Sequence, residues 1–276
     1  MSELIEKSLG KLKENKIPNA ELDLRILLNH ASNKKNEIFL SNFNIKDINI
    51  KLFRYFLSKR LNYEPIAKIL NEKYFWKHKF YVNHHVLDPR PETELIIEET
   101  LKNIKNKNQK ISILDVGTGS GCLAISLATE LPNAKITAID ISKKALEVAR
   151  KNIVINKVST QINVINCSIE DINEKYDFIV SNPPYISENE YNDLSNEIKK
   201  YEPKIALIGG KDGLFFYRNY ANHFERLMKN DSYLIIEIGN KQLDSCKSIF
   251  KVTNLKLKKI SKDINKIDRT LTFLKI

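Results

Sequence analysis

An apolar run followed by alternating glycines constrains the fold of this chain most strongly. Residues 111–116 are mainly apolar β-formers, Gly117, Gly119 and Gly121 follow them, and a helical pattern begins at Cys122. Glycine permits a tight turn and lets a ligand approach the backbone closely. The segment therefore predicts a buried strand, a ligand-binding turn and a helix, as in a doubly wound α/β sheet.

The acids near this turn indicate the ligand. The spacing Gly-x-Gly-x-Gly differs from the dinucleotide fingerprint Gly-x-Gly-x-x-Gly, and Asp115 stands at the strand end. Asp115 suits a ligand with a positive group, such as the amino-acid part of S-adenosylmethionine. A second predicted strand, 134–139, ends at Asp140, about 20 residues past the glycines, where doubly wound folds bind ribose hydroxyls.

A second motif follows the apolar run 178–180 and reads Asn182-Pro183-Pro184-Tyr185. The two prolines must end a strand, since proline fixes φ and has no N–H to donate. The side chain of Asn182 and the carbonyl of Pro183 can then point into a cleft as two acceptors beside the Tyr185 ring. This set suits a planar amino group, although an ordinary turn is the alternative for the motif taken alone.

Together the two motifs resemble the class I S-adenosylmethionine-dependent methyltransferases that methylate planar nitrogens. Asn-Pro-Pro-Tyr is shared by DNA adenine methyltransferases, some guanine methyltransferases and protein-glutamine methyltransferases. The motif therefore indicates the type of nitrogen and leaves the substrate open.

The remaining pattern divides the chain into three parts. Apolar residues at helical spacing predict three helices in an N-terminal bundle over 1–64, and 65–92 is expected to be a β-hairpin connector. Strands and helices alternate over 93–276, which predicts an α/β fold with a mostly parallel, seven-stranded, Rossmann-like sheet. The expected strands are 111–115, 135–139, 161–166, 176–180, 232–238, 254–260 and 269–275, and the expected helices there are 93–105, 121–130, 142–156, 190–200, 213–229 and 241–250.

Composition limits the remaining possibilities. Three unpaired cysteines and five histidines without ligand spacing indicate a reducing, cytoplasmic setting and no metal site. No apolar run is long enough to span a bilayer, so no membrane association is expected. The net charge of +11 comes from lysines scattered through the chain, so it is weak evidence for nucleic-acid binding.

A third set of motifs resembles the PrmC/HemK family, the peptide chain release factor glutamine methyltransferases. Pro89-Arg90-Pro91-Glu92-Thr93-Glu94 matches the signature of that family. Further matches run along nearly the whole chain: Glu64-Pro65-Ile66-Ala67, Phe75-Trp76, Glu202-Pro203, Ala206-Leu207, Gly209-Gly210, Asp212-Gly213-Leu214, Tyr217-Arg218, Glu237-Ile238-Gly239, Gln242, Asp263 and Arg269. The departures are Tyr63 and Asn71, where the family usually has glycine, Asp88 before the signature, and Ser168-Ile169 after the third strand.

The resemblance implies a function and a set of site residues. The substrate would be the glutamine of the Gly-Gly-Gln motif of a bacterial class 1 release factor, with no nucleic acid required. The N-terminal domain is expected to dock this substrate, because it has its own core and carries none of the cofactor motifs. Asn182, Pro183 and Tyr185 are expected to be catalytic, and the same residues with Pro184 to bind the acceptor amide. S-adenosylmethionine, which leaves as S-adenosylhomocysteine, is expected to contact Asp115, Gly117, Thr118, Gly119, Ser120, Gly121, Asp140, Ser168, Ile169 and Asn182.

Two other functions remain open from the sequence. A DNA or RNA methyltransferase could use the same turn on a flipped base, although no inserted recognition domain is seen. A non-enzymatic release-factor or ribosome-binding module could keep the fold, although the glycine loop and Asn-Pro-Pro-Tyr are intact. Arg90, Glu92 and Glu237 could be structural residues or could line the site.

Overall fold

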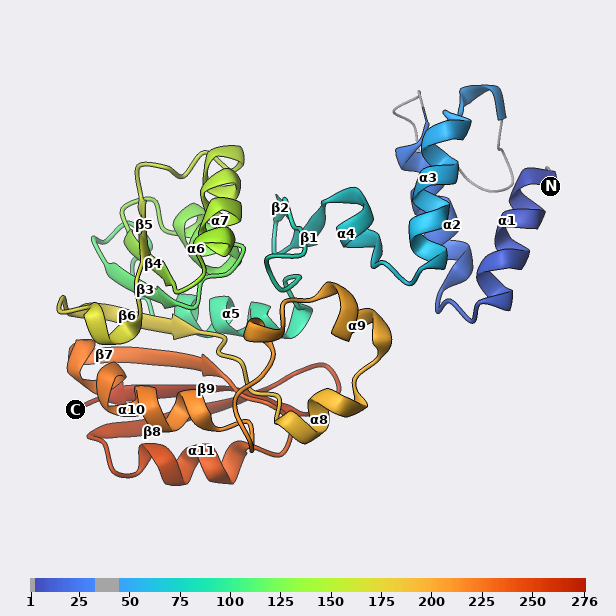
Figure 1. Ribbon diagram of the computed structural model, residues 1–276. Helices are drawn as coiled ribbons and strands as arrows, with labels where there is room; N and C mark the ends of the chain where they lie inside the picture. The colour runs from blue at the N-terminus through green and yellow to red at the C-terminus, as the bar shows by residue number, and fades with distance from the viewer. Residues whose placement is uncertain (1–2, 33–44) are drawn as a thin grey trace. The chain divides into compact units, whose positions relative to one another are not determined.

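The computed structural model describes residues 3–32 and 45–276, which fall into two compact units (Figure 1). Unit 1 contains Met1–Asn71 and Ser195–Tyr201, and unit 2 contains Glu72–Leu194 and Glu202–Ile276. Each unit is described by itself. None of the described helices is long and apolar enough to cross a membrane.

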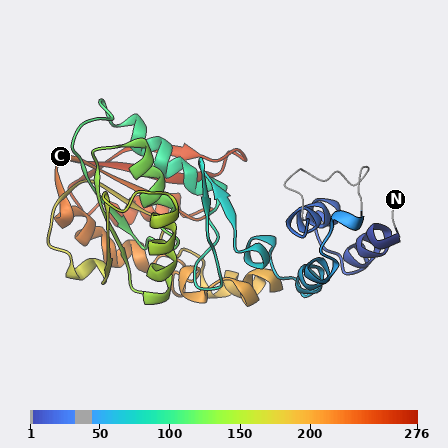
Figure 2. The ribbon, with the colours of Figure 1, turned by 90° about the horizontal axis from the view of Figure 1, so that it is seen from above.

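Unit 1 is a helical bundle in which the three longest helices pack on one another (Figure 2). The N-terminal helical region that the sequence predicts is thus confirmed. Its core consists of the apolar residues that repeat at helical spacing, among them Leu12, Leu24 and Phe53, all fully buried. The helices are α1 (Glu3–Glu14), α2 (Ala20–His30), η2 (Ile45–Asp47), α3 (Ile50–Leu61), α4 (Ile66–Leu70) and α9 (Asn196–Tyr201).

A buried ion pair joins two of these helices. Arg60 of α3 donates through Nε to Oδ2 of Asp23 in α2 at 2.7 Å, and both side chains are at most one-tenth exposed. Arg60 also donates to the carbonyl of Glu64 at 3.2 Å, so the charge is both paired and hydrogen-bonded. Such double satisfaction is what a buried charge requires.

Unit 2 is built on a seven-stranded sheet of order β5-β4-β3-β6-β7-β9-β8. The first five of these strands are parallel, whereas β9 is antiparallel to both β7 and β8, so the predicted mostly parallel α/β sheet is confirmed. The strands are β3 (Ser112–Val116), β4 (Lys135–Asp140), β5 (Ile162–Asn166), β6 (Tyr176–Ser181), β7 (Met228–Glu237), β8 (Leu255–Lys262) and β9 (Asp268–Lys275).

Helices cover both faces of this sheet (Figure 1). On one face lie α5 (Glu94–Lys102), α6 (Cys122–Glu130) and α7 (Lys143–Ile155). On the other lie α10 (Phe215–Leu227) and α11 (Leu243–Phe250), whose Tyr217, Phe224 and Phe250 are buried against the strands. The remaining elements are the hairpin β1 (Lys73–Phe75) and β2 (His78–Phe80), η3 (Pro91–Thr93), η4 (Ile169–Asp171), α8 (Glu188–Asp193) and η5 (Lys204–Ala206).

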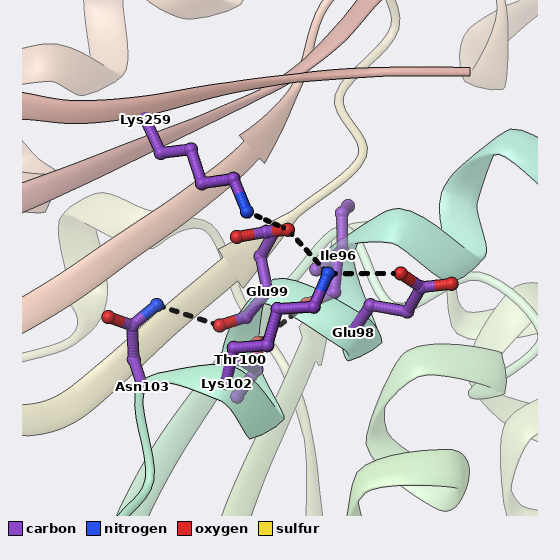
Figure 3. A network of polar contacts seen from close by, with 7 residues as sticks. All are labelled: Ile96, Glu98, Glu99, Thr100, Lys102, Asn103 and Lys259. Carbon is purple, nitrogen blue, oxygen red and sulfur yellow. Dashed lines mark hydrogen bonds and ion pairs between the residues drawn. The ribbon is translucent and has the colours of Figure 1, made fainter.

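An ion-pair cluster fastens α5 to the sheet (Figure 3). The Glu99 carboxylate is almost fully buried and accepts from Lys102 at 3.0 Å and from Lys259 of β8 at 2.9 Å. Burial opposes ionisation of Glu99, but the two lysines outweigh it and hold the pKa of its carboxyl below the usual value. The cluster thereby fixes the helix that begins directly after Thr93.

The order of the strands decides where a ligand binds. From β3 the chain passes to β4 and β5 on one side, and β6 and β7 lie on the other side. In open α/β sheets the ligand crevice opens at such a switch point, outside the carboxyl ends of the strands. Gly117, Asp140 and Asn182 each follow or end one of these strands at that edge.

Three predicted elements are corrected by the structure. The run 65–69, expected in the hairpin, forms α4, because the Pro65 carbonyl accepts from the N–H groups of Lys68 and Ile69 and starts a helical turn. The hairpin itself spans only 73–80. The predicted helix 190–200 is two helices, because Leu194 is extended and the Ser195 side chain caps the start of the second helix. Strand β7 begins at Met228, four residues before the predicted start at 232.

Two of the departures from the family pattern, Tyr63 and Asn71, occupy backbone conformations that favour glycine. Tyr63 has φ 64° and Asn71 has φ 55°, each just after a helix. After α3, Tyr63 N–H donates to the Arg60 carbonyl and Glu64 N–H to the Lys59 carbonyl, which is the Schellman pattern of a helix end. The departures are therefore left-handed positions occupied by side chains that tolerate them less well than glycine.

This geometry predicts that glycine is more stabilising than alanine at position 63, the reverse of their order inside a helix. Tyr63→Gly should be more stable than Tyr63→Ala by about 1 kcal/mol, because only alanine strains the left-handed backbone. The exposed helical residue Arg54 is the matched control. There the free energy of unfolding of Arg54→Ala should exceed that of Arg54→Gly by about 1 kcal/mol. Urea unfolding of the four variants measures both differences. A more stable Tyr63→Ala would contradict the helix-end geometry.

Candidate active site

A cavity in unit 2 lies at the carboxyl edge of the parallel strands and collects most of the predicted site residues. Asp115, Gly121 and Tyr185 are not among the residues that line it. The predicted residues that line it come from the segments after β3, β4, β5 and β6: Gly117, Thr118, Gly119, Ser120, Asp140, Ser168, Ile169, Asn182, Pro183 and Pro184.

The glycine loop after β3 keeps free space beside its backbone. Gly117 and Gly119 have φ of 73° and 54°, so other residues would strain the turn. A Cβ on Gly117 would meet no atom within 4 Å, which means that the loop presents bare backbone toward open space. The Gly117 and Thr118 N–H groups both donate to the Ile139 carbonyl at 2.9 Å and fasten the loop to β4.

Asp115 lies behind this loop, 1% exposed. Its Oδ2 accepts from the Thr118 hydroxyl at 2.6 Å and from the Ala124 N–H at 3.2 Å. Its Oδ1 has no hydrogen-bond partner within the described residues. Burial raises the pKa of Asp115 to about 7, against the effect of these two donors, and the charge of Asp140 raises it further. Asp115 thus has an unsatisfied carboxylate oxygen directly behind the glycine loop, although the residue does not line the cavity.

Asp140 ends β4 and lines the cavity. Its two oxygens accept from the Gly119 N–H at 3.0 Å and the Ser142 N–H at 2.8 Å. Burial raises the pKa of this carboxyl, and the two N–H donors oppose the rise. The hydrogen bonds fix the side chain between the glycine loop and α7, and each carboxylate oxygen retains a further lone pair.

The segment after β5 forms another part of the lining. Ile169 is buried and lines the cavity with an apolar side chain. Ser168 also lines it, but its hydroxyl bonds to Glu170 and Asp171 in the cap of η4. The structure thus places both residues at the cavity, with the Ser168 hydroxyl engaged in local structure.

Asn182 is held by its amide nitrogen. Nδ2 donates to the Thr93 hydroxyl at 2.9 Å, and the residue is partly buried at the cavity wall. With its nitrogen engaged, the amide has its oxygen Oδ1 for a donor from a ligand. Pro183 and Pro184 line the cavity beside it.

The backbone after Asn182 runs against three glycines. A Cβ on Gly209 would lie 2.5 Å from the Pro184 carbonyl oxygen, and one on Gly213 would lie 2.3 Å from the Tyr185 carbonyl oxygen. Gln242 accepts from the Gly239 N–H at 2.9 Å and donates to the Tyr185 carbonyl at 2.9 Å. These glycines and Gln242, distant in sequence, therefore hold the turn in place.

A buried carboxylate stands behind the turn. Glu237, at the end of β7, is 1% exposed and accepts from the Thr93 hydroxyl at 2.7 Å and the Tyr185 hydroxyl at 3.1 Å. Burial raises the pKa of Glu237 to about 7, although both hydroxyls and the charge of Arg269 oppose the rise. Burial, with the nearby Glu237 charge, raises the pKa of Tyr185 as well, so its phenol stays a donor.

Arg90 both pairs with a carboxylate and lines the cavity. Its guanidinium donates to Oε1 of Glu202 at 3.1 Å, and the other Glu202 oxygen accepts from the Asp88 N–H at 3.3 Å. The Glu202 side chain thus links the signature around Arg90 to the segment that contains Glu202-Pro203.

Several lining residues escaped the sequence reasoning. Phe216 and Tyr220 stand four residues apart on α10 and face the cavity, yet in sequence they resemble ordinary core residues. Thr93 lies inside the recognised signature but had no assigned role. The sequence carried one indication of Glu237, the hydrogen-bond partner of Thr93: it is an acidic residue at the end of an apolar strand. The other residues missed were His85, Val86, Leu87, Asp88, Pro89, Val116, Cys122, Leu123, Ile139, Ile141, Ser142, Ala145, Cys167, Ser181, Ile205 and Ala206.

Neither metal nor disulfide chemistry is evident in the described part of the chain. No group of three or more His, Cys, Asp and Glu side chains there could hold a metal ion. Cys122, Cys167 and Cys246 are free thiols in the structure. Burial raises the pKa of Cys122 to about 12, so this cavity-lining thiol is protonated at neutral pH.

Comparisons with known proteins agree with this fold. A family model for the methyltransferase small domain matches residues 90–207, and one for the PrmC N-terminal domain matches residues 3–70. A methyltransferase from Pyrococcus furiosus superposes with a TM-score of 0.51 at 21% identity, covering 79% of this chain and 96% of that one. The fold is that of a class I methyltransferase.

Curated relatives identify the family. A bifunctional methyltransferase of Rickettsia bellii is 37% identical over 95% of this chain, which spans only 52% of that relative's length. A release factor glutamine methyltransferase of Thermodesulfovibrio yellowstonii is 34% identical over 98% of both chains. The chain belongs to the family of release factor glutamine methyltransferases, as the sequence motifs indicated.

The packing around the turn predicts that Gly209 tolerates no side chain. Gly209→Ala would place its Cβ within 2.7 Å of two backbone oxygens, so it should destabilise the fold by about 1–3 kcal/mol. Gly10→Ala in α1, where no atom lies within 4 Å, is the control and should stabilise by about 0.5–1 kcal/mol. Urea unfolding of both variants measures this. Equal stability of Gly209→Ala and the wild type would contradict the packing.

Proposed function

We propose that this chain transfers a methyl group from S-adenosylmethionine to the side-chain amide nitrogen of the glutamine in the Gly-Gly-Gln motif of class 1 release factors. The observation that carries the proposal is the full-length similarity to a protein named release factor glutamine methyltransferase. The Asn182 amide at the cavity supports it independently, because its oxygen suits an N–H donor. A cytoplasmic location belongs to the same proposal, since translation takes place there.

The cavity residues fit the proposed cofactor. When bound, S-adenosylmethionine supplies an electrophilic methyl group on a sulfonium. The bare backbone at Gly117 and Gly119 gives it room, and the unsatisfied Oδ1 of Asp115 suits the region of its ammonium group. Asp140 would accept from the ribose hydroxyls and Ile169 would pack on the base. Thr118, Ser120, Gly121 and Ser168 complete the proposed cofactor residues, and Asn182 borders both substrates.

The chain would act on the acceptor by orientation. A glutamine amide nitrogen is a poor nucleophile, because its lone pair is delocalised into the carbonyl. In the proposal, Asn182 Oδ1 and the Pro183 carbonyl each accept one N–H and aim the face of the nitrogen at the methyl group. Both hydrogen bonds strengthen as the nitrogen becomes positive, so they favour the transition state. Pro184 would form part of the wall that excludes water from the amide, with Tyr185 behind it, hydrogen-bonded to Glu237.

One incubation tests this function. The purified chain is mixed with methyl-labelled S-adenosylmethionine and either a class 1 release factor or duplex DNA. Label should enter the release factor only, and mass spectrometry of its Gly-Gly-Gln peptide should locate a single methyl group on the glutamine. Label in DNA alone would overturn the proposal in favour of an exocyclic base amine.

Asn182 should be central to the rate. Asn182→Ala removes one of the two proposed acceptors, so the single-turnover rate should fall by about 10²–10³-fold, as for a lost transition-state hydrogen bond. Asn182→Asp keeps an acceptor of similar shape and should lose less, apart from the effect of its charge. Affinity for S-adenosylhomocysteine, measured by calorimetry for both variants and for Asp140→Ala, separates the roles. It should fall roughly 10-fold or more only for Asp140→Ala, which loses charged hydrogen bonds.

Unit 1 and the proposed domain division have a separate test. We infer a helical docking domain over 1–64, a connector over 65–92 and a catalytic domain over 93–276, supported by the separate core of the bundle. A shortened protein that begins at Lys73 should bind S-adenosylhomocysteine and methylate a short Gly-Gly-Gln peptide. Its activity on the intact release factor should be largely lost. Undiminished activity on the intact factor would refute the docking role.

A further inference from the structure

Behind Asn182 lies a hydrogen-bond chain that no part of the proposed mechanism uses. We propose that Thr93 and Glu237 are positioning residues, which together fix the orientation of the Asn182 amide so that its oxygen, and not its nitrogen, meets the acceptor. This inference rests on the proposed function and adds two residues to it.

The chain has a defined direction. The Asn182 Nδ2 donates to the Thr93 hydroxyl oxygen at 2.9 Å, and the Thr93 hydroxyl donates to Glu237 Oε2 at 2.7 Å. The other carboxylate oxygen accepts from the Tyr185 hydroxyl at 3.1 Å. Three elements contribute: the loop after β6, the η3 turn and the end of β7.

The direction matters because an amide side chain has two nearly isosteric orientations. If the Asn182 amide were flipped, its NH2 group would face the NH2 group of the substrate glutamine. Two donors cannot hydrogen-bond to each other, so the substrate nitrogen would lose this contact. A threonine hydroxyl has one hydrogen, and Glu237 takes it. The Thr93 oxygen is then left as an acceptor, so only the Asn182 nitrogen can bond to it. Glu237 therefore sets the orientation of Asn182 through Thr93.

The buried position of Glu237 makes this arrangement depend on its charge. An ionised carboxylate accepts from both hydroxyls. When Glu237 is protonated on Oε2, it instead donates to the Thr93 oxygen and competes there with the Asn182 nitrogen. Burial raises the pKa of Glu237 to about 7. The charged and titratable groups whose fields or contacts reach Glu237 come from several elements: Glu92 beside Thr93, Tyr185, Cys122 on α6, Tyr217 on α10 and Arg269 on β9, which pairs with Asp263.

Thr93 offers the sharpest substitution. Thr93→Val keeps the shape and removes the hydroxyl, whereas Thr93→Ser keeps the hydroxyl and removes a methyl group. The single-turnover rate on a release factor should fall up to about 10²-fold for Thr93→Val, as for a small misplacement of reacting groups. Thr93→Ser should restore it to within a few-fold of the wild type. Affinity for S-adenosylhomocysteine should be unchanged in both, since the change concerns the acceptor.

A double-mutant cycle tests whether Thr93 acts through Asn182. If it does, Thr93→Val should slow the wild type but have almost no further effect in the Asn182→Ala background, because residues that act as one unit are not additive. If the rate loss of the double variant equals the product of the two single losses, Thr93 acts independently of Asn182 and the inference is overturned.

Glu237→Gln adds a readout that a purely structural role would not produce. Above its raised pKa the buried charge lowers stability, since the native state disfavours the ionised form that the unfolded state accepts. Glu237→Gln should therefore be at least as stable as the wild type at about pH 8, yet slower in methyl transfer. As the pH falls through about 7, the wild-type rate should decline more steeply than the rate of the variant, in which Asp115 but not position 237 still titrates near that pH.

The outcomes separate this inference from the function on which it rests. If the wild type methylates no release factor, the proposed function fails first. If the wild type is active and Thr93→Val matches it, the positioning role fails and the function stands. If Glu237→Gln does not fold, the Thr93 pair and the cycle still decide, because Thr93→Val lacks the hydroxyl and Thr93→Ser keeps it.

Discussion

The geometry of the site depends on how β6 ends. Two prolines stop a strand that lies between β3 and β7, so the backbone leaves the sheet at its carboxyl edge directly beside the glycine loop. The chain that leaves the sheet then needs neighbours without side chains. Gly209 and Gly213 lie so close to its carbonyl oxygens that a Cβ at either position would clash with them. A motif of four residues is thus held by glycines that lie about thirty residues further along.

Buried carboxylates recur at this edge of the sheet. Asp115 and Glu237 are each 1% exposed, and burial raises the pKa of both to about 7. A buried acid lowers stability at neutral pH, because the unfolded chain ionises it more readily. Perturbed acids of this kind concentrate at functional sites. Asp115, with its unsatisfied oxygen, and Glu237 behind Asn182 therefore lower the stability of the sheet at neutral pH, as perturbed acids at functional sites do.

Much of the fold could be predicted from the sequence because its signals are local. The parallel sheet followed from apolar runs that alternate with helical stripes, and all seven strands were placed to within a few residues. Errors arose where a local pattern was ambiguous. The short run 66–70 suits either a strand or a helix, and only the Pro65 carbonyl, which accepts two N–H groups, decides for α4. Similarly, Leu194 interrupts a run that looked like one continuous helix.

By itself the sequence determined the fold class, the glycine loop with Asp140, and the Asn-Pro-Pro-Tyr turn, since each depends on backbone conformations that few residues adopt. Only the tertiary structure decided which side chains meet. Thr93, Asn182 and Glu237 are as much as 144 residues apart, yet hydrogen bonds link them because η3, β6 and β7 end side by side. Likewise, Phe216 and Tyr220 line the cavity because α10 covers that end of the sheet. Periodicity shows which residues are buried, but it does not show which residues they face.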